Sequence, residues 1–266
     1  MDELERIEVA AVLDFFAAAT PEIAAGQDLA VLDLDGAVAF SWGALPTWRL
    51  FNRVVGLESD SRLPEAEAFF ASRKCSFAIS LTPESRLADA LRRRGYEPTD
   101  GSMKFRRGVE PAPEASTSLR VDRIGTEGAE EFGAVLAKAF ELGQPVGRWH
   151  ATLPTRHGWA CFGAFDDRVL VATAMAYFAD NLGWLGAAGT MPAARGRGAQ
   201  SALLAARIRA AAEAGVEVLA VETDIGIEGD AGVSHRNVLR AGFQPAYVQQ
   251  WWVRPQGMSP EHQAPS

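Results

Sequence analysis

The chain has 266 residues, 48% of them hydrophobic, which is enough to bury one large core or two smaller ones. Its formal charge of −8 argues against a general surface for nucleic acid or anionic membranes. The acidic start, Met1 to Glu8, is unlike a signal peptide, and no uncharged apolar run is long enough to span a bilayer. Because Cys75 and Cys161 lack metal-binding spacing, we expect a cytoplasmic protein with reduced thiols and no metal.

The first half of the chain predicts alternating helices and strands. The turn pair Asp35-Gly36 joins two short apolar runs into a hairpin. Pro64 and Pro83 each begin a helix, because proline suits the first helical position. The expected helices are 4–19, 64–73 and 83–94, and the expected strands are 29–34, 37–42, 51–57, 76–81 and 103–107.

The second half begins after a segment rich in proline, alanine and small polar residues, so we interpret 109–118 as a linker. The expected order is a strand, two helices, three strands, a long helix, a strand, a shorter helix and a final strand pair. The strands that can be bounded are 119–124, 159–165, 169–178, 182–191 and 218–223, and the first two helices are 126–141 and 146–156. Residues 256–266 form a polar tail that we expect to be flexible.

The segment Arg195-Gly196-Arg197-Gly198 stands between a glycine-rich strand and an alanine-rich helix that ends near Gly215. Glycines let a ligand approach the backbone, and the first N–H groups of a helix have no partner within it. The helix dipole and the two arginines add positive charge at the same place. The order of strand, basic turn and helix therefore favours a phosphate site over a turn with solvated arginines.

Two common phosphate-binding motifs fit this segment less well. A P-loop is excluded because the Gly-Lys-Ser/Thr ending is missing. A dinucleotide-binding fingerprint has the first glycine spacing at Gly196 and Gly198 and an acid at Glu222, but Ser201 replaces the third glycine. Too little chain follows to complete a doubly wound sheet.

At these residues the sequence resembles the GNAT superfamily of acyl-CoA N-acyltransferases. Thr190-Met191-Pro192 matches the step at the end of the family's signature strand, and Arg195, Gly198 and Gln200 occupy the three positions of its turn motif, with Gln200 in place of glycine or alanine. The resemblance extends over the order of elements from Leu119 to Arg254. It implies a mixed α/β (α+β) fold, a splayed strand pair and acetyl-CoA as co-substrate.

The first half echoes the second. Residues 91–98 (LRRRGYEP) resemble residues 238–245 (VLRAGFQP), which indicates an internal duplication, although two unrelated α/β segments would also give such a short match. The first copy has no Pro-Xaa-Xaa-Arg-Gly-Xaa-Gly turn. We therefore expect two GNAT-like domains, a degenerate one at 1–108 and an acetyltransferase domain at 119–255, each a mostly antiparallel mixed sheet flanked by helices.

The resemblance also implies a set of cofactor contacts. Backbone groups at the end of the glycine-rich strand would hold the pantetheine arm and the thioester. The basic turn and the first helical turn would hold the pyrophosphate, and Asn237 in the last helix would reach the arm. The predicted cofactor-binding residues are Gly189, Thr190, Met191, Arg195, Gly196, Arg197, Gly198, Ala199, Gln200, Ser201 and Asn237.

Transfer of an acyl group to an amine needs a base for the amine and an acid for the departing thiolate. The tyrosine that many relatives use as acid is Val238 here, and the usual early-strand carboxylate is replaced by Trp184 and Leu185. We therefore name three replacement candidates for catalysis: Glu222, His235 and Tyr247. Glu222 and His235 also have structural interpretations, as a hydrogen-bonded strand-end acid and a solvent-facing histidine, and Tyr247 is the remaining hydroxyl of suitable reach.

Two functions remain open. The first is an N-acetyltransferase that acts on a primary amine of a small molecule or peptide, as a monomer or homodimer, without nucleic acid or membrane. The second is a non-catalytic acyl-CoA-binding or scaffold protein, which the degenerate first half and the missing tyrosine favour. Trp149 and His150 would lie on the acceptor side in the family, where they would touch substrate or only pack.

Overall fold

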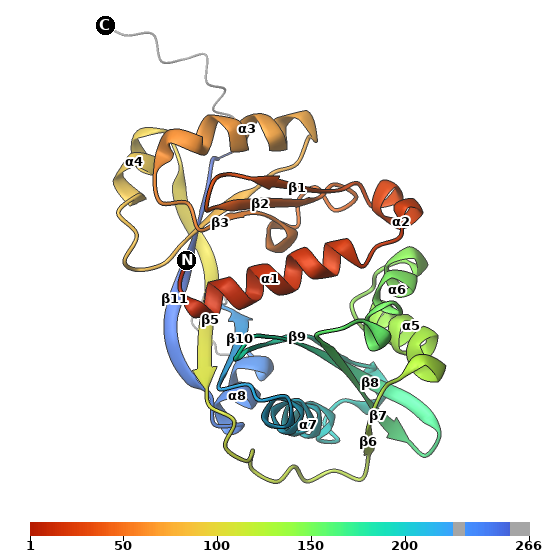
Figure 1. Ribbon diagram of the computed structural model, residues 1–266. Helices are drawn as coiled ribbons and strands as arrows, with labels where there is room; N and C mark the ends of the chain where they lie inside the picture. Colours follow the sequence, from red (N-terminus) through yellow and green to blue (C-terminus); the bar gives the residue numbers. More distant parts are fainter. Residues whose placement is uncertain (226–231, 256–266) are drawn as a thin grey trace, which may run out of the picture.

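The computed structural model describes residues 1–225 and 232–255, and in this part of the chain eleven strands form one sheet (Figure 1). The first half contains α1 (Glu3–Ala17), α2 (Pro21–Gly26), β1 (Leu29–Asp33), β2 (Val38–Trp42), the 3₁₀ turn η1 (Arg49–Phe51), β3 (Asn52–Val55), α3 (Leu63–Ser72), β4 (Ala78–Leu81), α4 (Ala88–Arg93) and β5 (Glu97–Arg107). The second half contains β6 (Arg120–Arg123), α5 (Ala129–Ala139), α6 (Gln144–His150), β7 (Trp159–Asp166), β8 (Val169–Ala179), β9 (Leu182–Thr190), α7 (Ala199–Glu213), β10 (Val218–Asp224), α8 (Val233–Arg240) and β11 (Gln244–Val253). No described helix combines the length and apolar character that crossing a bilayer requires.

The two halves exchange their last strands. The sheet order is β1-β2-β3-β4-β11-β5-β10-β9-β8-β7-β6, so β11 lies beside β4 of the first half and β5 lies beside β10 of the second. β5 and β11 pair antiparallel and run together from one part of the molecule to the other (Figure 1). Each half therefore completes its sheet with a strand from the other half.

The halves repeat one order of elements. β1, β2, β3, α3, β4, α4 and β5 correspond in sequence to β7, β8, β9, α7, β10, α8 and β11. In each half one strand pair is parallel, β3 with β4 and β9 with β10, and the strands before that pair are antiparallel. The predicted mixed α/β tandem fold is confirmed.

The structure differs from the sequence prediction in four places. Helix α2 was not expected, although Thr20 caps it by accepting a hydrogen bond from the N–H of Ile23. Helix α4 is shorter than predicted because residues 83–87 form turns. β5 is longer, since it pairs with strands on both sides. The predicted final strand pair is wrong, because the partner of β11 comes from the first half. The expected tail at 256–266 lies outside the described residues.

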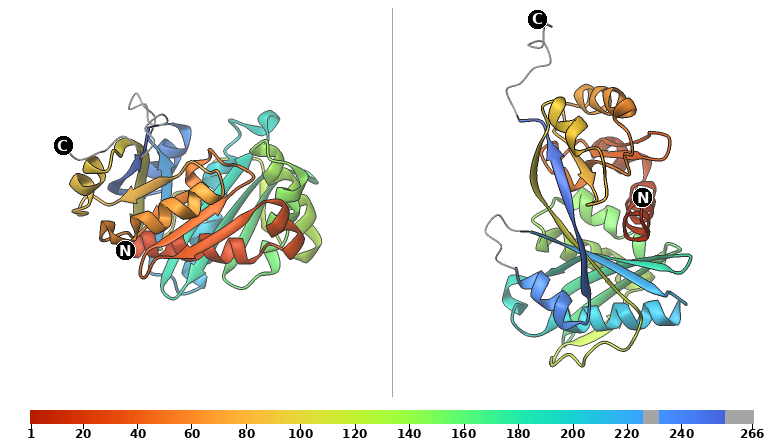
Figure 2. Two further views of the ribbon diagram at one scale, coloured as in Figure 1. Left: turned by 90° about the horizontal axis from the view of Figure 1, so that it is seen from above. Right: turned by 90° about the vertical axis from the view of Figure 1, so that its left-hand side faces the viewer.

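Helix α1 lies between the two halves in both Figures 1 and 2. It begins at Asp2, whose carboxylate caps it by accepting a hydrogen bond of 2.8 Å from the N–H of Glu5. Its apolar side chains join one core with residues of β2, α5, α6 and β7 to β9. In that core the rings of Phe15 and Trp149 stack with centroids 3.8 Å apart. The helix therefore packs against second-half elements as well as its own half.

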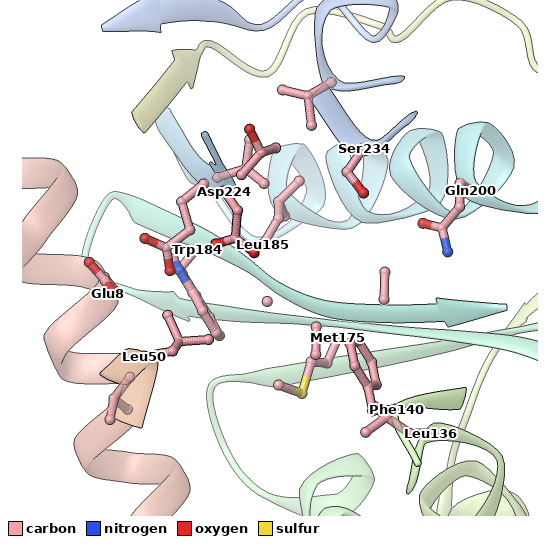
Figure 3. Close-up of a pocket in the computed structure, with 18 of the residues that line it drawn as sticks. Glu8, Leu50, Leu136, Phe140, Met175, Trp184, Leu185, Gln200, Asp224 and Ser234 are labelled. Carbon is pink, nitrogen blue, oxygen red and sulfur yellow. The ribbon is translucent and has the colours of Figure 1, made fainter. Parts of the chain in front are cut away.

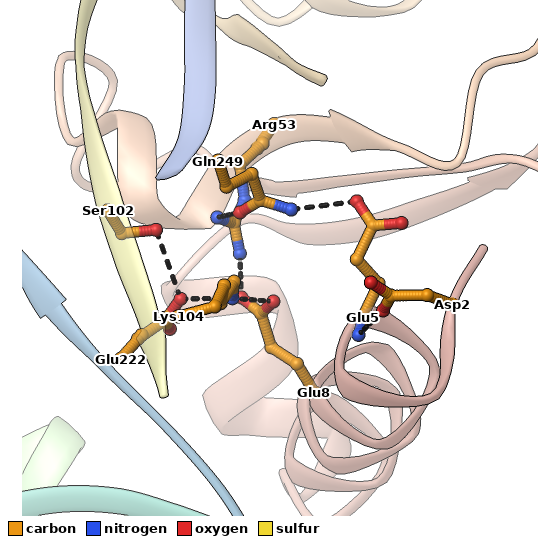
Figure 4. A network of polar contacts seen from close by, with 8 residues as sticks. All are labelled: Asp2, Glu5, Glu8, Arg53, Ser102, Lys104, Glu222 and Gln249. Atoms are coloured by element: carbon orange, nitrogen blue, oxygen red, sulfur yellow. Dashed lines mark hydrogen bonds and ion pairs between the residues drawn. The ribbon is translucent and has the colours of Figure 1, made fainter. Parts of the chain in front are cut away.

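A buried charge network connects α1 to the exchanged strands (Figure 4). The carboxylate of Glu8 accepts hydrogen bonds from Arg53 of β3 and Lys104 of β5, and Lys104 also donates to Glu222 of β10. The Glu8, Arg53 and Lys104 side chains are at most 3% exposed, whereas Glu222 is 15% exposed. Two carboxylates thus share two cations from separate strands, and their mutual charge compensation permits their burial.

Burial opposes ionisation of Glu8, but the charges of Arg53 and Lys104 outweigh it and lower the pKa of Glu8 to about 2. The ordinary value is 4.5. A carboxyl group whose pKa is depressed in the folded state stabilises that state above the unfolded pKa, and this contribution is lost as the pH falls through the folded pKa. Ionised Glu8 therefore stabilises the fold fully above pH 4.5 and loses that effect between 4.5 and about 2.

We expect Glu8→Gln to lower the free energy of unfolding by about 3–5 kcal/mol at pH 7, because it leaves two buried cations with too little negative charge. The difference in the free energy of unfolding between the variant and the wild type should become smaller as the pH falls from 4.5 toward 2. Urea unfolding followed by circular dichroism at several pH values measures both effects.

Glu3→Gln is the matched control on the same helix, since Glu3 forms an exposed ion pair with Arg106. It should cost less than about 1 kcal/mol. If both substitutions lowered the free energy of unfolding equally, the buried network would contribute no more to stability than an exposed ion pair.

Candidate functional site

The turn before α7 has the backbone that its glycines predict. Gly196 and Gly198 have φ values of 78° and 81°, in the left-handed region that favours glycine. Gly198 is the residue before the helix, and no side chain caps the helix there. The first N–H groups of α7, from Ala199 onward, are therefore available for an anionic ligand.

The two arginines of the turn differ in their contacts. Arg197 forms a bidentate pair with Asp166 at the end of β7, with N···O distances of 2.6 and 2.8 Å. Arg195 is exposed, and its Nε makes a long contact of 3.5 Å with the carbonyl oxygen of Thr190. Arg195 thus keeps more of its hydrogen-bonding capacity for a ligand, whereas Arg197 also holds the turn against β7.

The segment that connects the halves packs on this turn. Thr117 Oγ1 donates a hydrogen bond of 2.7 Å to the carbonyl oxygen of Arg197. A Cβ added at Gly198 would overlap the carbonyl oxygen of Ser116, whereas one at Gly196 would meet no described atom within 4 Å. Gly198 is therefore required by close packing as well as by its backbone angles.

Strands β9 and β10 splay as the resemblance implied. They pair only from Leu182–Val218 to Trp184–Ala220, and beyond these residues no further pair joins them in the described register. The pairing of β9 with β8 shifts register at this point, which marks a bulge. Buried Arg207 of α7 donates to the carbonyl oxygens of Met175 and Gly186, at 3.3 and 3.2 Å, and so satisfies acceptors beside the bulge.

At the end of β9, the backbone N–H and C=O groups of alternate residues point into the gap between β9 and β10. The N–H of Met191 donates to Val171 of β8, and its carbonyl oxygen accepts from Ala194. Because backbone groups alternate in direction along an antiparallel strand, Gly189 also faces β8, while Ala188 and Thr190 face the gap. Of the three predicted backbone contacts, Thr190 thus points its backbone groups into the gap, whereas those of Gly189 and Met191 pair with β8.

A cavity of about 460 Å³ passes through the splay. Gln200 and Ser234 line it on the side of α7 and α8, while Glu8 and Leu50 line it on the side of α1 (Figure 3). Gln200 also bridges α7 to β9, since its Nε2 donates a hydrogen bond of 2.9 Å to Thr190 Oγ1. The cavity thus connects the basic-turn helix to the first half of the chain.

Glu222 lies on β10 directly opposite Lys104 of β5, and it lines the cavity. Burial raises the pKa of Glu222 above its ordinary value, and the nearby Glu8 carboxylate raises it further, while Lys104 and Arg53 act in the opposite direction. Ser102 Oγ is 3.4 Å from its carboxylate. A partly exposed carboxylate with a raised pKa is suited to accept a proton.

His235 and Asn237 of α8 also line the cavity. His235 Nδ1 lies 3.4 Å from Thr223 Oγ1, and its ring meets the edge of Phe105. Thr223 and Glu222 are neighbours on β10, so their side chains point to opposite faces of the sheet. Glu222 therefore faces α1, while His235 lies on the face that α8 covers.

The other candidates are less favourably placed. Tyr247 is not among the described residues that line the cavity, and burial with the nearby Asp2 carboxylate raises its pKa. Val238, at the position of the family's tyrosine, is buried and lines the cavity. His150 lines it too, and burial lowers the pKa of His150 to about 4, so it is neutral at pH 7. Trp149 does not line it, and its Nε1 donates to the carbonyl oxygen of Phe15.

The sequence did not reveal the first-half side chains at the site. Glu8, Arg53 and Lys104 lie far apart along the chain, and only the exchanged strands bring them beside Glu222. Trp184 also lines the cavity, and its buried Nε1 finds no hydrogen-bond partner in the part of the chain that the structure describes. The signal that could have pointed to these first-half side chains was the presence of acidic residues within the otherwise apolar sequence of α1. Among the described residues no group of three metal-ligating side chains occurs.

The chain resembles known proteins in sequence and in fold. Residues 130–228 match the model of the acetyltransferase (GNAT) family. No curated protein matches the sequence. Among solved structures, the chain is similar to a GCN5-related N-acetyltransferase from Kribbella flavida, with a TM-score of 0.65, 18% identity and 97% of each chain covered.

Two further structures show the same fold. A GCN5-related N-acetyltransferase from Sphaerobacter thermophilus has a TM-score of 0.62 at 18% identity, over 84% of this chain and 83% of that one. A tandem GNAT protein from the clavulanic acid biosynthesis pathway has a TM-score of 0.55 at 16% identity, over 80% of this chain and 76% of that one. At sequence identities this low, the similarity shows a shared fold and no more.

We expect Gly198→Ala to destabilise the protein more than Gly196→Ala. Both substitutions force alanine into a left-handed conformation, at about 1–2 kcal/mol, but only the first also drives a Cβ into the connecting segment. Thermal unfolding of the two variants measures the difference, and equal melting temperatures would show that the segment does not constrain the turn.

Proposed function

We propose, from the match of residues 130–228 to the model of the acetyltransferase (GNAT) family, that the protein transfers an acetyl group from acetyl-CoA to a primary amine of a small molecule or peptide. The observation that carries the proposal is the cavity that joins the first turn of α7, at Gln200, to the carboxylate of Glu222. The proposal includes a cytoplasmic setting, in which the buried free thiols of Cys75 and Cys161 stay reduced, and a monomer or homodimer.

The residues present fit the phosphate and thioester parts of acetyl-CoA. The uncapped N-terminus of α7 and the exposed Arg195 suit the pyrophosphate. The gap between β9 and β10 suits the pantetheine arm, with backbone groups of Ala188 and Thr190 along one side and Asn237 along the other. Bound acetyl-CoA would supply the acetyl group as an activated thioester.

In this proposal Glu222 accepts a proton from the amine, directly or through water, so that the nitrogen lone pair is free to attack the thioester carbon. The backbone N–H groups of Ala188 or Thr190 stabilise the negative charge that develops on the carbonyl oxygen. His235, on the α8 side of β10, supplies a proton to the sulfur as the carbon–sulfur bond breaks, and the nitrogen releases its second proton to water as the amide forms. The products are the acetylated amine and free CoA. Tyr247 has no part in this proposal because it does not line the cavity.

We expect Arg195→Glu to weaken acetyl-CoA binding by about tenfold or more, because it places a negative charge where the pyrophosphate binds. Arg209→Glu, an exposed change on the same helix, should leave the affinity nearly unchanged. Calorimetric titration of both variants and the wild type measures the affinities. Failure of the wild type to bind would refute the proposal, and binding without turnover of any amine would favour the non-catalytic alternative.

We expect Glu222→Gln to lower kcat/KM by about 10²- to 10⁴-fold, since the amide cannot accept the proton. The raised pKa of Glu222 places the acidic fall of the wild-type profile above the pH at which an ordinary glutamate titrates, because the carboxylate must be ionised to act. In the variant, kcat/KM should no longer show this decrease at acidic pH. Profiles of kcat/KM against pH test both points, with the exposed Glu213→Gln as control. An unchanged acidic limb in the variant would assign the base to another group.

A further inference from the structure

The first half of the chain forms one wall of the cavity. Val12 and Phe15 of α1, Trp42 of β2, and Trp48 and Phe51 around η1 all line it, opposite second-half side chains. These first-half residues lie on the α1 side of the splay, away from the basic turn of α7. The part of the cavity that remains for an acceptor is therefore enclosed by both halves.

Aromatic rings dominate this part of the cavity. The rings of Trp42, Trp48 and Phe51 contact one another, with centroids 5.0 to 5.5 Å apart. Trp42 is buried, whereas Trp48 and Phe51 are only partly buried and so keep surface for a ligand. Flat aromatic walls bind a flat ring with more contact, and in better geometry, than they bind a flexible alkyl chain.

Polar groups gather at the inner end of the same space. Trp184 is the last β9 residue that pairs with β10, opposite Ala220, and Glu222 follows two residues later on the same face of β10. The indole Nε1 of Trp184 is buried without a hydrogen-bond partner among the described residues, and an unpaired buried donor is costly. An unpaired donor and a carboxylate acceptor thus flank the splay beside the aromatic wall.

This arrangement narrows the class of acceptor, if the chain is the acetyltransferase proposed above. We propose that the acceptor is an arylalkylamine, a primary amine on a short chain that ends in a flat aromatic ring. The ring packs against Trp48 and Phe51, and the amine reaches Glu222. In the acetylated product the amide N–H donates to Glu222. The degenerate half then serves as the acceptor-binding half.

The test compares phenethylamine with hexylamine, amines of similar apolar size that differ in having a planar ring. We expect kcat/KM to be about tenfold higher for phenethylamine. Trp48→Ala and Phe51→Ala should each remove most of this preference, mainly through KM, and leave the dissociation constant for acetyl-CoA unchanged. Phe69→Ala is the control, since Phe69 is a similarly half-buried ring on α3, outside the cavity.

Calorimetric binding of phenethylamine to the full chain, with and without CoA, separates this inference from the acetyltransferase proposal. If phenethylamine binds the wild type and Trp48→Ala abolishes this binding, the aromatic wall is supported as a ligand site. This holds even if acetyl-CoA does not bind and the acetyltransferase proposal fails. Equal use of the two amines by a protein that binds acetyl-CoA overturns only the acceptor class. The acceptor class is also overturned if phenethylamine fails to bind the folded wild type, or binds equally to the folded Trp48 and Phe51 variants.

Discussion

The charge network around Lys104 is the constraint on which the site depends. Lys104 comes from the exchanged strand β5, and it holds Glu8 of the helix between the halves and Glu222 of the second-half strand. A carboxylate as buried as Glu222 would be costly without such a cation. Its raised pKa reflects burial and Glu8 acting against Lys104 and Arg53. Strand exchange therefore sets the protonation chemistry of the site as well as the shape of the sheet.

The same strand, β10, separates the two chemical tasks of the proposed reaction. Side chains alternate along a strand, so Glu222 faces α1 and Thr223 faces α8, where it contacts His235. The splay is the opening between these faces, because β9 and β10 stop pairing after Trp184 and Ala220. An acceptor on one face and a thioester on the other can meet only there. The bulge that Arg207 supports keeps this opening in place.

Local features of the fold could be predicted from the sequence, and contacts between the halves could not. The turn at 195–198 and the helix after it follow from glycine angles and helix termini, which neighbouring residues determine. The exchange of β5 and β11 involves strands of similar composition that pair across the whole chain, and no local pattern distinguishes which partner each takes. Glu222 was therefore identified as a candidate base, but the cations that surround it were not.

The imperfect apolar stripe of α1 has a physical explanation in this arrangement. Glu5 and Glu8 are buried, and each has a polar partner from an exchanged strand, Gln249 of β11 and Lys104 of β5. Acids on the buried side of a helix need such partners to offset the cost of their burial. The first half lacks a counterpart of the turn at 195–198, but this does not make that half dispensable. In the proposed function its helix, its aromatic wall and its last strand supply what the second half lacks for an enclosed acceptor site.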